Sequence, residues 1–353
     1  MPRLLIDIYK IKNLNSGIGQ FSYNFAEEYS RHIPPGYKTT FLVPWTFQKP
    51  HLWPIKTCRA TLLKRNLPWL NPHYDLWHSL HQFPAHYPGL KTKWILTIHD
   101  LNFLVEKSEE KAANYLKKLQ TNIDKATAIT VISEYTKKLV TENLRLCDKP
   151  LYMIHNGIKG NEFPGSSKPA FLMNERFFFS IGIVTAKKNF HVLLPLMHHF
   201  PDHELVIAGD IESPYARQLL EQLNSSGLAN RVHLPGNITE QQKYWLYAHC
   251  EAFLFPSLAE GFGMPVIEAM LLGKPVFSSR NTSLPEIGGE IAFYWDNFKP
   301  EYMAEVLRKG LKRYALEREQ LSAQIISHAR QFNWTTCIEK YRSVYREVLE
   351  MRV

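Results

Sequence analysis

Short apolar runs alternate with longer amphipathic stretches along the whole chain. This alternation is typical of βαβ units, in which helices separate buried parallel strands. It predicts an α/β chain with two Rossmann-like, doubly wound parallel sheets. The runs that we expect to form strands lie at residues 3–8, 39–43, 75–81, 93–99, 126–133 and 150–158 in the first half, and at 176–182, 204–210, 231–236, 252–257 and 275–279 in the second.

A segment dense in Gly, Pro and Ser, residues 161–169, separates the two sets of strands and is typical of a linker. We therefore expect an N-terminal domain over residues 1–160 and a C-terminal domain over residues 170–332. The length of 353 residues suits two domains of ordinary size. Apolar side chains recur at helical spacing in residues 333–353, which predicts a final amphipathic helix.

The net charge of +9 is unevenly distributed. Residues 1–165 hold 22 Lys and Arg against 13 Asp and Glu, whereas residues 166–353 hold 20 against 20. A basic half is consistent with a solvated surface, but it also suits anionic lipid headgroups or a phosphorylated acceptor. Because no recognition motif accompanies the charge, we expect no nucleic acid partner.

The chain contains no run of the roughly 18 to 20 apolar residues that a membrane-spanning helix needs, and no signal-type segment follows Met1. We therefore expect a cytoplasmic protein. The aromatic and proline-rich stretch at 43–54, together with the basic first half, suggests a peripheral contact at the inner face of the cytoplasmic membrane.

The most informative stretch is FLFPSLAEGFGMPVIEAMLLGKPV, residues 253–276. An apolar strand leads into a glycine-rich turn, and Pro265 stands at the expected start of a helix. Unpaired backbone amides at such a helix start, with the helix dipole behind them, suit a diphosphate. Glu260 and Glu268 flank this position, and carboxylates accept hydrogen bonds from sugar hydroxyls. The alternative is that Glu268 only satisfies the helix N-terminus and that Glu260 is solvated.

The spacing Glu-Gly-Phe-Gly-x-Pro-x-x-Glu-Ala-Met resembles the nucleotide-sugar signature of family-four retaining glycosyltransferases. The resemblance implies the GT-B fold, in which two Rossmann-like domains face each other and a C-terminal helix crosses back to the first domain. It implies that Glu260 binds donor-sugar hydroxyls in the active centre and that Glu268 binds the nucleotide ribose. Gly261, Phe262 and Gly263 would then lie against the sugar and phosphates.

A basic pair, Lys187 and Lys188, follows the first strand of the second half and precedes a helix that we expect to begin near Asn189. Cations at this position neutralise the diphosphate and stabilise the leaving group. The family often has an Arg directly after the glycine that corresponds to Gly182, but this chain has Ile183. The cationic role therefore falls to the two lysines, with Lys188 the better match and a catalytic candidate. We expect no metal ion and no other cofactor.

Glycines 17 and 19 follow the first strand, where the resemblance implies a loop over the donor phosphates; a plain turn is the alternative. In TIHDLNF the resemblance assigns His99 to the donor sugar and Asp100 to the acceptor side. Two isolated residues do not make a metal site. His78 and His81 are better interpreted as fold residues, although His81 is also a weak acceptor candidate.

Three further residues belong to the predicted site. Ser133 resembles a family serine beside the acceptor, with simple helix capping as the favoured explanation. Gly236 and Ile238 resemble the segment that receives the nucleotide base.

The sequence therefore predicts a retaining hexosyltransferase that transfers a sugar from a nucleotide diphosphate to a glycan or glycolipid acceptor in polysaccharide or lipopolysaccharide biosynthesis. The patterns TAKKN and SLPEIGGEIAFY resemble bacterial enzymes of surface-polysaccharide assembly, which favours mannose from GDP-mannose. UDP-glucose, UDP-galactose and UDP-N-acetylglucosamine remain alternative donors. A nucleotide-sugar epimerase and a non-catalytic sugar-nucleotide binder are further alternatives.

Overall fold

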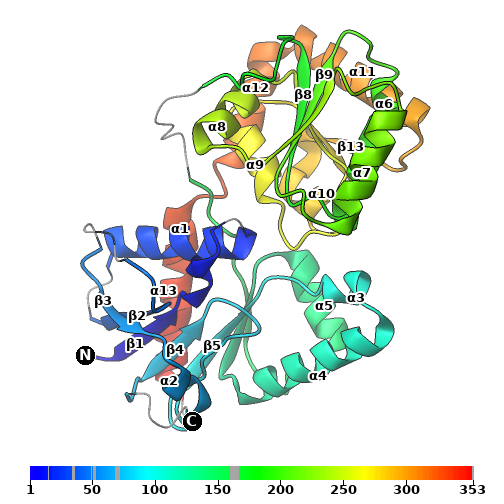
Figure 1. Cartoon of the computed structure of the whole chain (residues 1–353). Coiled ribbons are helices and arrows are strands. Elements are labelled where there is room, and N and C mark those ends of the chain that lie inside the picture. The colour runs from blue at the N-terminus through cyan, green and yellow to red at the C-terminus, as the bar shows by residue number, and fades with distance from the viewer. Residues whose placement is uncertain are drawn as a thin grey trace. The chain divides into compact units, whose positions relative to one another are not determined.

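A computed structural model describes residues 1–14, 16–33, 36–48, 50, 53–67, 72–159 and 167–351. The chain divides into two compact units (Figure 1). Unit 1 comprises Met1–Lys159 and Phe332–Val353, and unit 2 comprises Gly160–Gln331. Most of the expected linker, residues 161–166, lies outside the described residues.

Unit 1 is built on a seven-stranded parallel sheet of order β3-β2-β1-β4-β5-β6-β7. The apolar runs predicted from the sequence supply its central strands because both faces of the sheet are covered. The strands are β1 Arg3–Asp7, β2 Lys38–Val43, β3 Lys56–Arg59, β4 Leu76–Ser79, β5 Lys93–Ile98, β6 Ala128–Val131 and β7 Leu151–Met153. The helices are η1 Tyr9–Lys12, α1 Gly17–Arg31, α2 Leu62–Asn66, α3 Phe103–Glu106, α4 Glu109–Lys125, α5 Glu134–Asn143 and α13 Trp334–Glu350.

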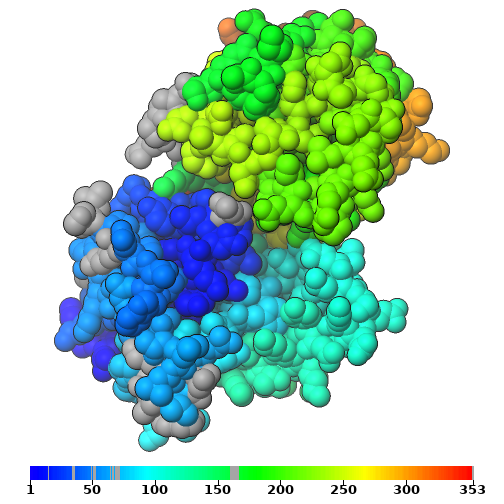
Figure 2. Space-filling view, viewed as in Figure 1, coloured from blue at the N-terminus to red at the C-terminus, as the bar shows by residue number. Residues whose placement is uncertain are grey.

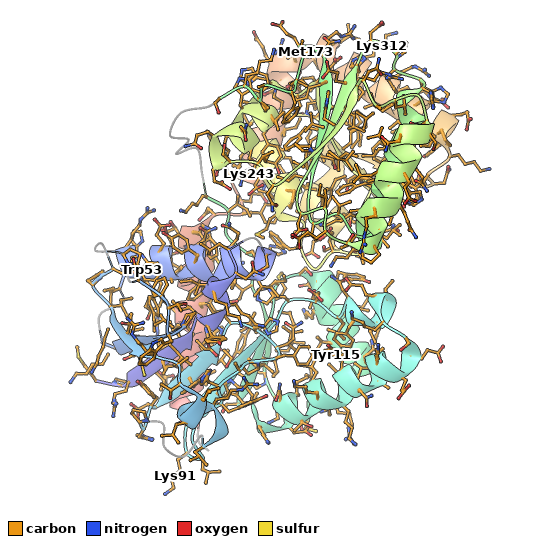
Figure 3. All side chains as sticks on the ribbon, viewed as in Figure 1. Trp53, Lys91, Tyr115, Met173, Lys243 and Lys312 are labelled. Carbon is orange, nitrogen blue, oxygen red and sulfur yellow. The ribbon has the colours of Figure 1, made fainter. Side chains whose placement is uncertain are left out.

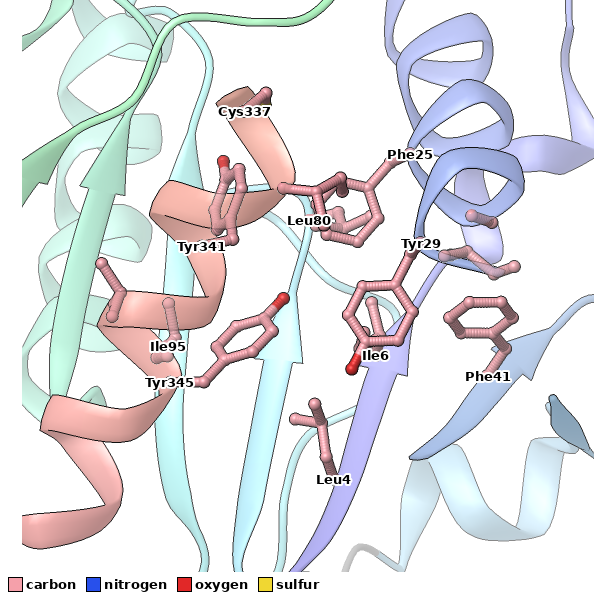
Figure 4. Packing of buried hydrophobic residues seen from close by; sticks show 14 of the residues in the cluster. Leu4, Ile6, Phe25, Tyr29, Phe41, Leu80, Ile95, Cys337, Tyr341 and Tyr345 are labelled. Carbon is pink, nitrogen blue, oxygen red and sulfur yellow. The ribbon is translucent and has the colours of Figure 1, made fainter. Parts of the chain in front are cut away.

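The C-terminal helix α13 completes the core of unit 1, as the sequence predicts. Its apolar stripe is buried against α1 and the sheet. In Figure 4, Tyr341 and Tyr345 of α13 lie beside Phe25 and Tyr29 of α1. The helix begins against the backbone of Gly157, where a Cβ atom would lie 2.5 Å from the Cα atom of Trp334.

Unit 2 contains a six-stranded parallel sheet of order β10-β9-β8-β11-β12-β13. Its strands are β8 Phe177–Ile181, β9 Glu204–Ala208, β10 Val232–Gly236, β11 Ala252–Phe255, β12 Val276–Ser279 and β13 Phe293–Trp295. Its helices are η3 Ala186–Lys188, η4 Phe190–Val192, α6 Leu193–Met197, α7 Pro214–Ser225, α8 Glu240–His249, α9 Met264–Leu271, α10 Leu284–Gly288, η5 Gly289–Ile291, α11 Pro300–Leu316 and α12 Arg318–Ala329. The prediction of two doubly wound parallel sheets is confirmed.

One local expectation is wrong. The sequence predicts a helix that begins near Asn189, but the chain forms two short 3-10 turns there, and α6 starts only at Leu193. Asn189 adopts a left-handed conformation (φ 58°), which an asparagine tolerates better than most residues and which interrupts a helix. The break leaves Lys188 at the end of a tight turn.

Within the described part of the chain, no helix is both long and apolar enough to cross a membrane.

Candidate active site

Lys188 reaches back to the carboxyl end of the unit 2 sheet. Its side chain is 11% exposed, and its Nζ atom lies 2.5 Å from Oε1 of Glu260 and 4.8 Å from the ring centroid of Phe255. A Cβ atom on Gly182 would lie only 3.0 Å from Cε of Lys188, so the lysine stem passes directly over this glycine. Gly182 has φ 153°, and its backbone amide bonds to Ala208, which fixes the turn after β8.

Glu260 is held by two hydrogen bonds to its carboxylate and one from its backbone. Oε1 accepts hydrogen bonds from both Lys188 Nζ and Ser257 Oγ, the latter at 2.6 Å. The backbone amide of Glu260 donates to Oγ1 of Thr282 at 3.1 Å. Its side chain is only 13% exposed, which excludes the alternative that Glu260 is simply solvated. Among the described residues Oε2 has no partner, so this oxygen faces no competitor for a ligand hydroxyl.

The glycine-rich turn is held in place by hydrogen bonds to its backbone carbonyl groups. Ser283 Oγ donates to the carbonyl oxygens of Glu260 and Phe262 at 3.0 and 2.9 Å. Gly263 precedes α9 with φ 109°, and a Cβ atom there would lie 2.8 Å from Leu284. No side chain caps this helix start, and the amide of Val266 donates to the carbonyl of Gly263 at 3.0 Å. Binding of an anion at this helix start stays a prediction. Gly261 is buried within the same turn.

Glu268 projects from the second turn of α9 toward α8 rather than back to the helix N-terminus. Its Oε2 atom accepts from Tyr247 Oη at 2.8 Å, and its Oε1 atom lies 3.6 Å from Lys243 Nζ. Burial alone would lower the pKa of Lys243, but the carboxylates of Glu268 and Glu240 raise it above its usual value. Lys243, labelled on α8 in Figure 3, is therefore a permanent cation beside Glu268.

The residues predicted to receive the nucleotide base lie at the end of β10. Gly236 has φ 74°, and its carbonyl accepts from the amide of Gly209 at 2.9 Å. Ile238 is half-buried. Lys187 is also half-buried, and its carbonyl accepts from the amide of Leu258 at 2.7 Å, which ties η3 to the loop after β11. The roles assigned to these residues stay predictions.

His99 lies buried at the carboxyl end of β5 in unit 1. Its Nε2 atom is 2.8 Å from the carbonyl oxygen of Leu80, so Nε2 carries the hydrogen. Burial lowers the pKa of His99 to about 4, and the imidazole is neutral at physiological pH. Its ring packs edge-on against Phe21 at a centroid distance of 4.9 Å. His99 is thus a neutral side chain, fixed in orientation.

The two neighbouring histidines differ in their surroundings. Both ring nitrogens of the buried His78 are hydrogen bonded, to Tyr345 Oη at 2.7 Å and to Thr97 Oγ1 at 2.8 Å, as expected for a fold residue. His81 is half-buried, and its Nδ1 atom accepts from the amide of Phe83 at 3.0 Å. Burial lowers the pKa of each to about 3.

The remaining predicted residues of unit 1 have local structural contacts. Gly17 is exposed at the start of α1. A Cβ atom on Gly19 would lie 1.8 Å from the carbonyl oxygen of Asn13, so Gly19 permits close packing of the loop. Asp100 accepts from the amide of Asn102 at 3.0 Å. Ser133 caps α5, accepting from the amide of Thr136 at 3.1 Å.

Sequence reasoning missed the partners that orient the site. Ser257, Tyr247 and Lys243 fix the two glutamates, and Thr136 Oγ1 donates to the backbone carbonyl of His99 at 3.1 Å. Only Ser257 carried a sequence signal, because it stands directly after β11 and three residues before Glu260. Within the described ranges, no group of three His, Cys, Asp or Glu side chains is placed to hold a metal ion.

Two family models match the chain. The model described as Glycosyl transferases group 1 matches residues 166–332, and the model described as Glycosyltransferase Family 4 matches residues 21–160. Over 235 residues the chain is 27% identical to the serotype-specific mannosyltransferase WbdA of Escherichia coli, a match that covers 62% of this chain but only 28% of WbdA. Over 272 residues it is 25% identical to the O-antigen chain mannosyltransferase B of Escherichia coli, with 71% of this chain and 70% of that protein covered.

The fold is similar to that of a solved structure described as Anabaena HepE in complex with UDP-glucose. The TM-score is 0.75 at 17% sequence identity, with 98% of this chain and 100% of that chain covered. Together, the two parallel sheets, the ordered glutamates of unit 2 and these matches show that the chain belongs to the GT-B glycosyltransferases of the family-four type.

Proposed function

We propose that the chain is a retaining mannosyltransferase that transfers mannose from GDP-mannose to a glycan or glycolipid acceptor in surface-polysaccharide biosynthesis. The observation that carries the proposal is the buried pair of Lys188 and Glu260 at the carboxyl end of the unit 2 sheet. Parallel sheets bind ligands at this edge. The choice of mannose is supported by the similarity to WbdA and to the O-antigen chain mannosyltransferase B, both mannosyltransferases.

In this proposal Lys188 acts on the leaving group. An ammonium group has three N–H donors, and Glu260 occupies one of them. The other two remain for the donor diphosphate, whose negative charge grows as the bond to the sugar breaks. The uncapped start of α9 adds backbone amides to the same anion. This positive charge is the basis for proposing that transfer needs no metal ion.

The two glutamates would then divide the hydroxyl contacts. Oε2 of Glu260 is available to the sugar hydroxyls, while Glu268, oriented by Tyr247 and Lys243, is available to the ribose. His99 would contact the donor sugar as a neutral imidazole, because burial lowers its pKa to about 4. A protein base is not required in this scheme, since the departing phosphate accepts the proton of the acceptor hydroxyl.

Donor choice is tested by a thermal-shift screen of the purified chain against GDP, UDP, ADP and dTDP and their sugars. A ligand at 100 times its dissociation constant adds about 2.7 kcal/mol of stability. We expect the largest shift with GDP and GDP-mannose. A larger shift with UDP-glucose, UDP-galactose or UDP-N-acetylglucosamine would replace mannose in the proposal. UDP-glucose is the specific alternative because it is the ligand named for HepE.

The reaction itself is tested with the preferred donor and a set of lipid-linked and free glycans. NMR of the product should show the anomeric configuration of the donor retained, and turnover should persist in excess EDTA. An inverted product would exclude the retaining mechanism, and loss of turnover in EDTA that added Mg²⁺ restores would exclude metal independence. Epimerised donor formed without acceptor would favour an epimerase, and donor binding without any conversion would favour a non-catalytic binder.

A peripheral membrane contact is the second part of the proposal. Trp45, Leu62 and Leu63 of unit 1 are 66%, 74% and 61% exposed, and the guanidinium of Arg59 lies 5.5 Å from the ring centroid of Trp45. Exposed apolar side chains beside a cation suit an anionic membrane surface. Flotation with liposomes containing anionic lipid at low salt is the test, and protein that stays at the bottom of the gradient would remove this part.

A further inference from the structure

Three lysines gather at the carboxyl end of the unit 1 sheet. Lys10 and Lys12 lie in η1, directly after β1, and Lys118 is exposed on α4. The segment that contains α4 is cyan at the surface of unit 1 in Figure 2. We call these three residues the lysine cluster. Burial and the charge of Lys12 lower the pKa of Lys10, Asp7 opposes this shift, and Lys118 adds to it, so the three ammonium groups lie within electrostatic range of one another. In the described part of the chain, none of them lies within ion-pair distance of a carboxylate.

The lysine cluster adjoins His81, because the Phe83 ring beside Lys118 lies 6.0 Å from the His81 ring. Burial lowers the pKa of His81 to about 3, and the charges of Lys10, His99 and Lys118 act in the same direction. Asp7, at the end of β1, is the acid whose charge acts on Lys10. Burial raises the pKa of Asp7 to about 7, which disfavours its charged form. Three ammonium groups against this one carboxyl group leave the lysine cluster with an excess of positive charge.

Aromatic side chains line the lysine cluster on both sides. The ammonium of Lys12 lies 4.9 Å from the ring centroid of Tyr9, and that of Lys118 lies 5.5 Å from the ring centroid of Phe83. The Phe83 ring contacts the ring of Tyr115, which is labelled in Figure 3, at a centroid distance of 5.4 Å. Flat apolar faces beside cations provide surfaces for a sugar ring or a hydrocarbon chain next to a bound anion.

We propose that the lysine cluster binds a phosphate or diphosphate group carried by the acceptor. Three like charges held together repel one another, and a phosphate dianion relieves that repulsion while accepting hydrogen bonds from each ammonium. That the bound anion belongs to the acceptor rests on the proposed glycosyl transfer. The anion site itself does not depend on that function. A phosphorylated lipid and a soluble phosphorylated sugar share this chemistry.

The test is calorimetric titration of the full chain with inorganic pyrophosphate. The cluster variant carries Lys10→Gln, Lys12→Gln and Lys118→Gln. Its matched control carries Lys111→Gln, Lys117→Gln and Lys125→Gln, which removes the same charge from exposed positions of α4. A third protein, Lys188→Met with Glu260→Gln, removes the charges of the donor site. Circular dichroism establishes that each variant is folded.

We expect two pyrophosphate sites in the wild type and in the matched control. The cluster variant should lose one of them, with its dissociation constant weakened at least about tenfold, as loss of charge-assisted hydrogen bonds predicts. The donor-site variant should lose only the other. Equal binding by the cluster variant and the control would overturn the proposal. If only the donor-site variant loses pyrophosphate binding, the lysine cluster is refuted as an anion site and the proposed donor site stands. If only the cluster variant loses pyrophosphate binding, the assignment of Lys188 and Glu260 to the donor site fails.

A second titration identifies the source of the phosphate. Farnesyl diphosphate is compared with pyrophosphate and with farnesol on the same proteins. Tighter binding of farnesyl diphosphate that requires the lysine cluster supports a lipid-linked acceptor, and equal binding of the two diphosphates supports a soluble phosphorylated one. Equal binding of farnesol and farnesyl diphosphate would show that the phosphate contributes nothing, and this result also refutes the proposal.

Discussion

The buried pair of Lys188 and Glu260 should contribute to folding as well as to chemistry. Replacing Lys188 by Met leaves the Glu260 carboxylate largely buried with only Ser257 as a partner. Removing one member of a buried ion pair costs about 3–5 kcal/mol. Because Ser257 remains and both side chains keep some exposure, we expect about 3 kcal/mol. For a unit of this size that corresponds to a fall in melting temperature of about 6–12 °C.

The double variant separates stability from catalysis. In Lys188→Met with Glu260→Gln neither site bears a charge, and the Gln side chain still accepts from Ser257 Oγ. We expect the double variant to be no less stable than either single variant, which corresponds to a coupling energy of about 2–3 kcal/mol in a double-mutant cycle. Turnover should nevertheless stay at least about a hundredfold below wild type, the usual cost of losing one stabilising group at a developing charge.

An exposed pair in the same unit provides the control. Lys309 Nζ and Glu305 Oε1 on α11 are also 2.5 Å apart, but their side chains are 76% and 60% exposed. Lys309→Met and Glu305→Gln should leave the melting temperature unchanged, because solvent screens such pairs. Thermal and urea unfolding followed by circular dichroism measure all of these variants. A Lys188→Met protein with the melting temperature of the wild type would refute the predicted role of the ion pair in stability. A double variant with normal turnover would refute its predicted role in catalysis.

Two further measurements follow from the geometry. Tyr247→Phe removes one hydrogen bond that orients Glu268. The dissociation constant for the free nucleotide, measured by calorimetry, should therefore rise about fivefold to tenfold, with the turnover number unchanged. An unchanged dissociation constant would contradict the assignment of Glu268. Acid should destabilise unit 1, because His78, His81 and His99 have pKa values of about 3, 3 and 4 in the folded chain and about 6.5 unfolded. The unfolded chain then binds more protons, so stability falls as the pH drops from 6.5 toward 4, by about 2 kcal/mol per histidine at pH 5. Urea unfolding at pH 7.5 and pH 5 measures this effect, and equal free energies at the two pH values would exclude it.

The sequence predicts the sheets well where both faces of a strand are buried. Strand β11 is a continuous apolar run and β8 is interrupted only by Ser180, and such short apolar runs are typical of strands buried on both faces. Strand β3, KTCR, was missed because it lies at the sheet edge, partly exposed, and has no apolar run. The three-residue strand β13 is too short for any pattern to show. The turn at Asn189 was missed because its left-handed conformation is a property of the folded loop.

The sequence motif identifies Glu260 and Lys188 separately but not their pairing. The two residues are 72 positions apart and meet only because β8 and β11 are neighbours in the sheet. The same holds for Tyr247, whose hydroxyl reaches Glu268 from another helix. Such contacts depend on the order of strands and on packing between helices, which local patterns do not encode.

The uneven charge of the chain acquires a physical explanation at the level of single side chains. In unit 2 the site cations have carboxylate partners, as in Lys188 with Glu260 and Lys243 with Glu268. A cation with a resident partner is not left unpaired when a ligand leaves, so the proposed donor site would stay electrically balanced between turnovers. Among the described residues, Lys10, Lys12 and Lys118 form no ion pair, and only the charge of Asp7 opposes their effect on the pKa of Lys10. The two proposals, a donor site with paired cations and an acceptor edge that binds an anion, would match the balanced second half and the basic first half of the sequence.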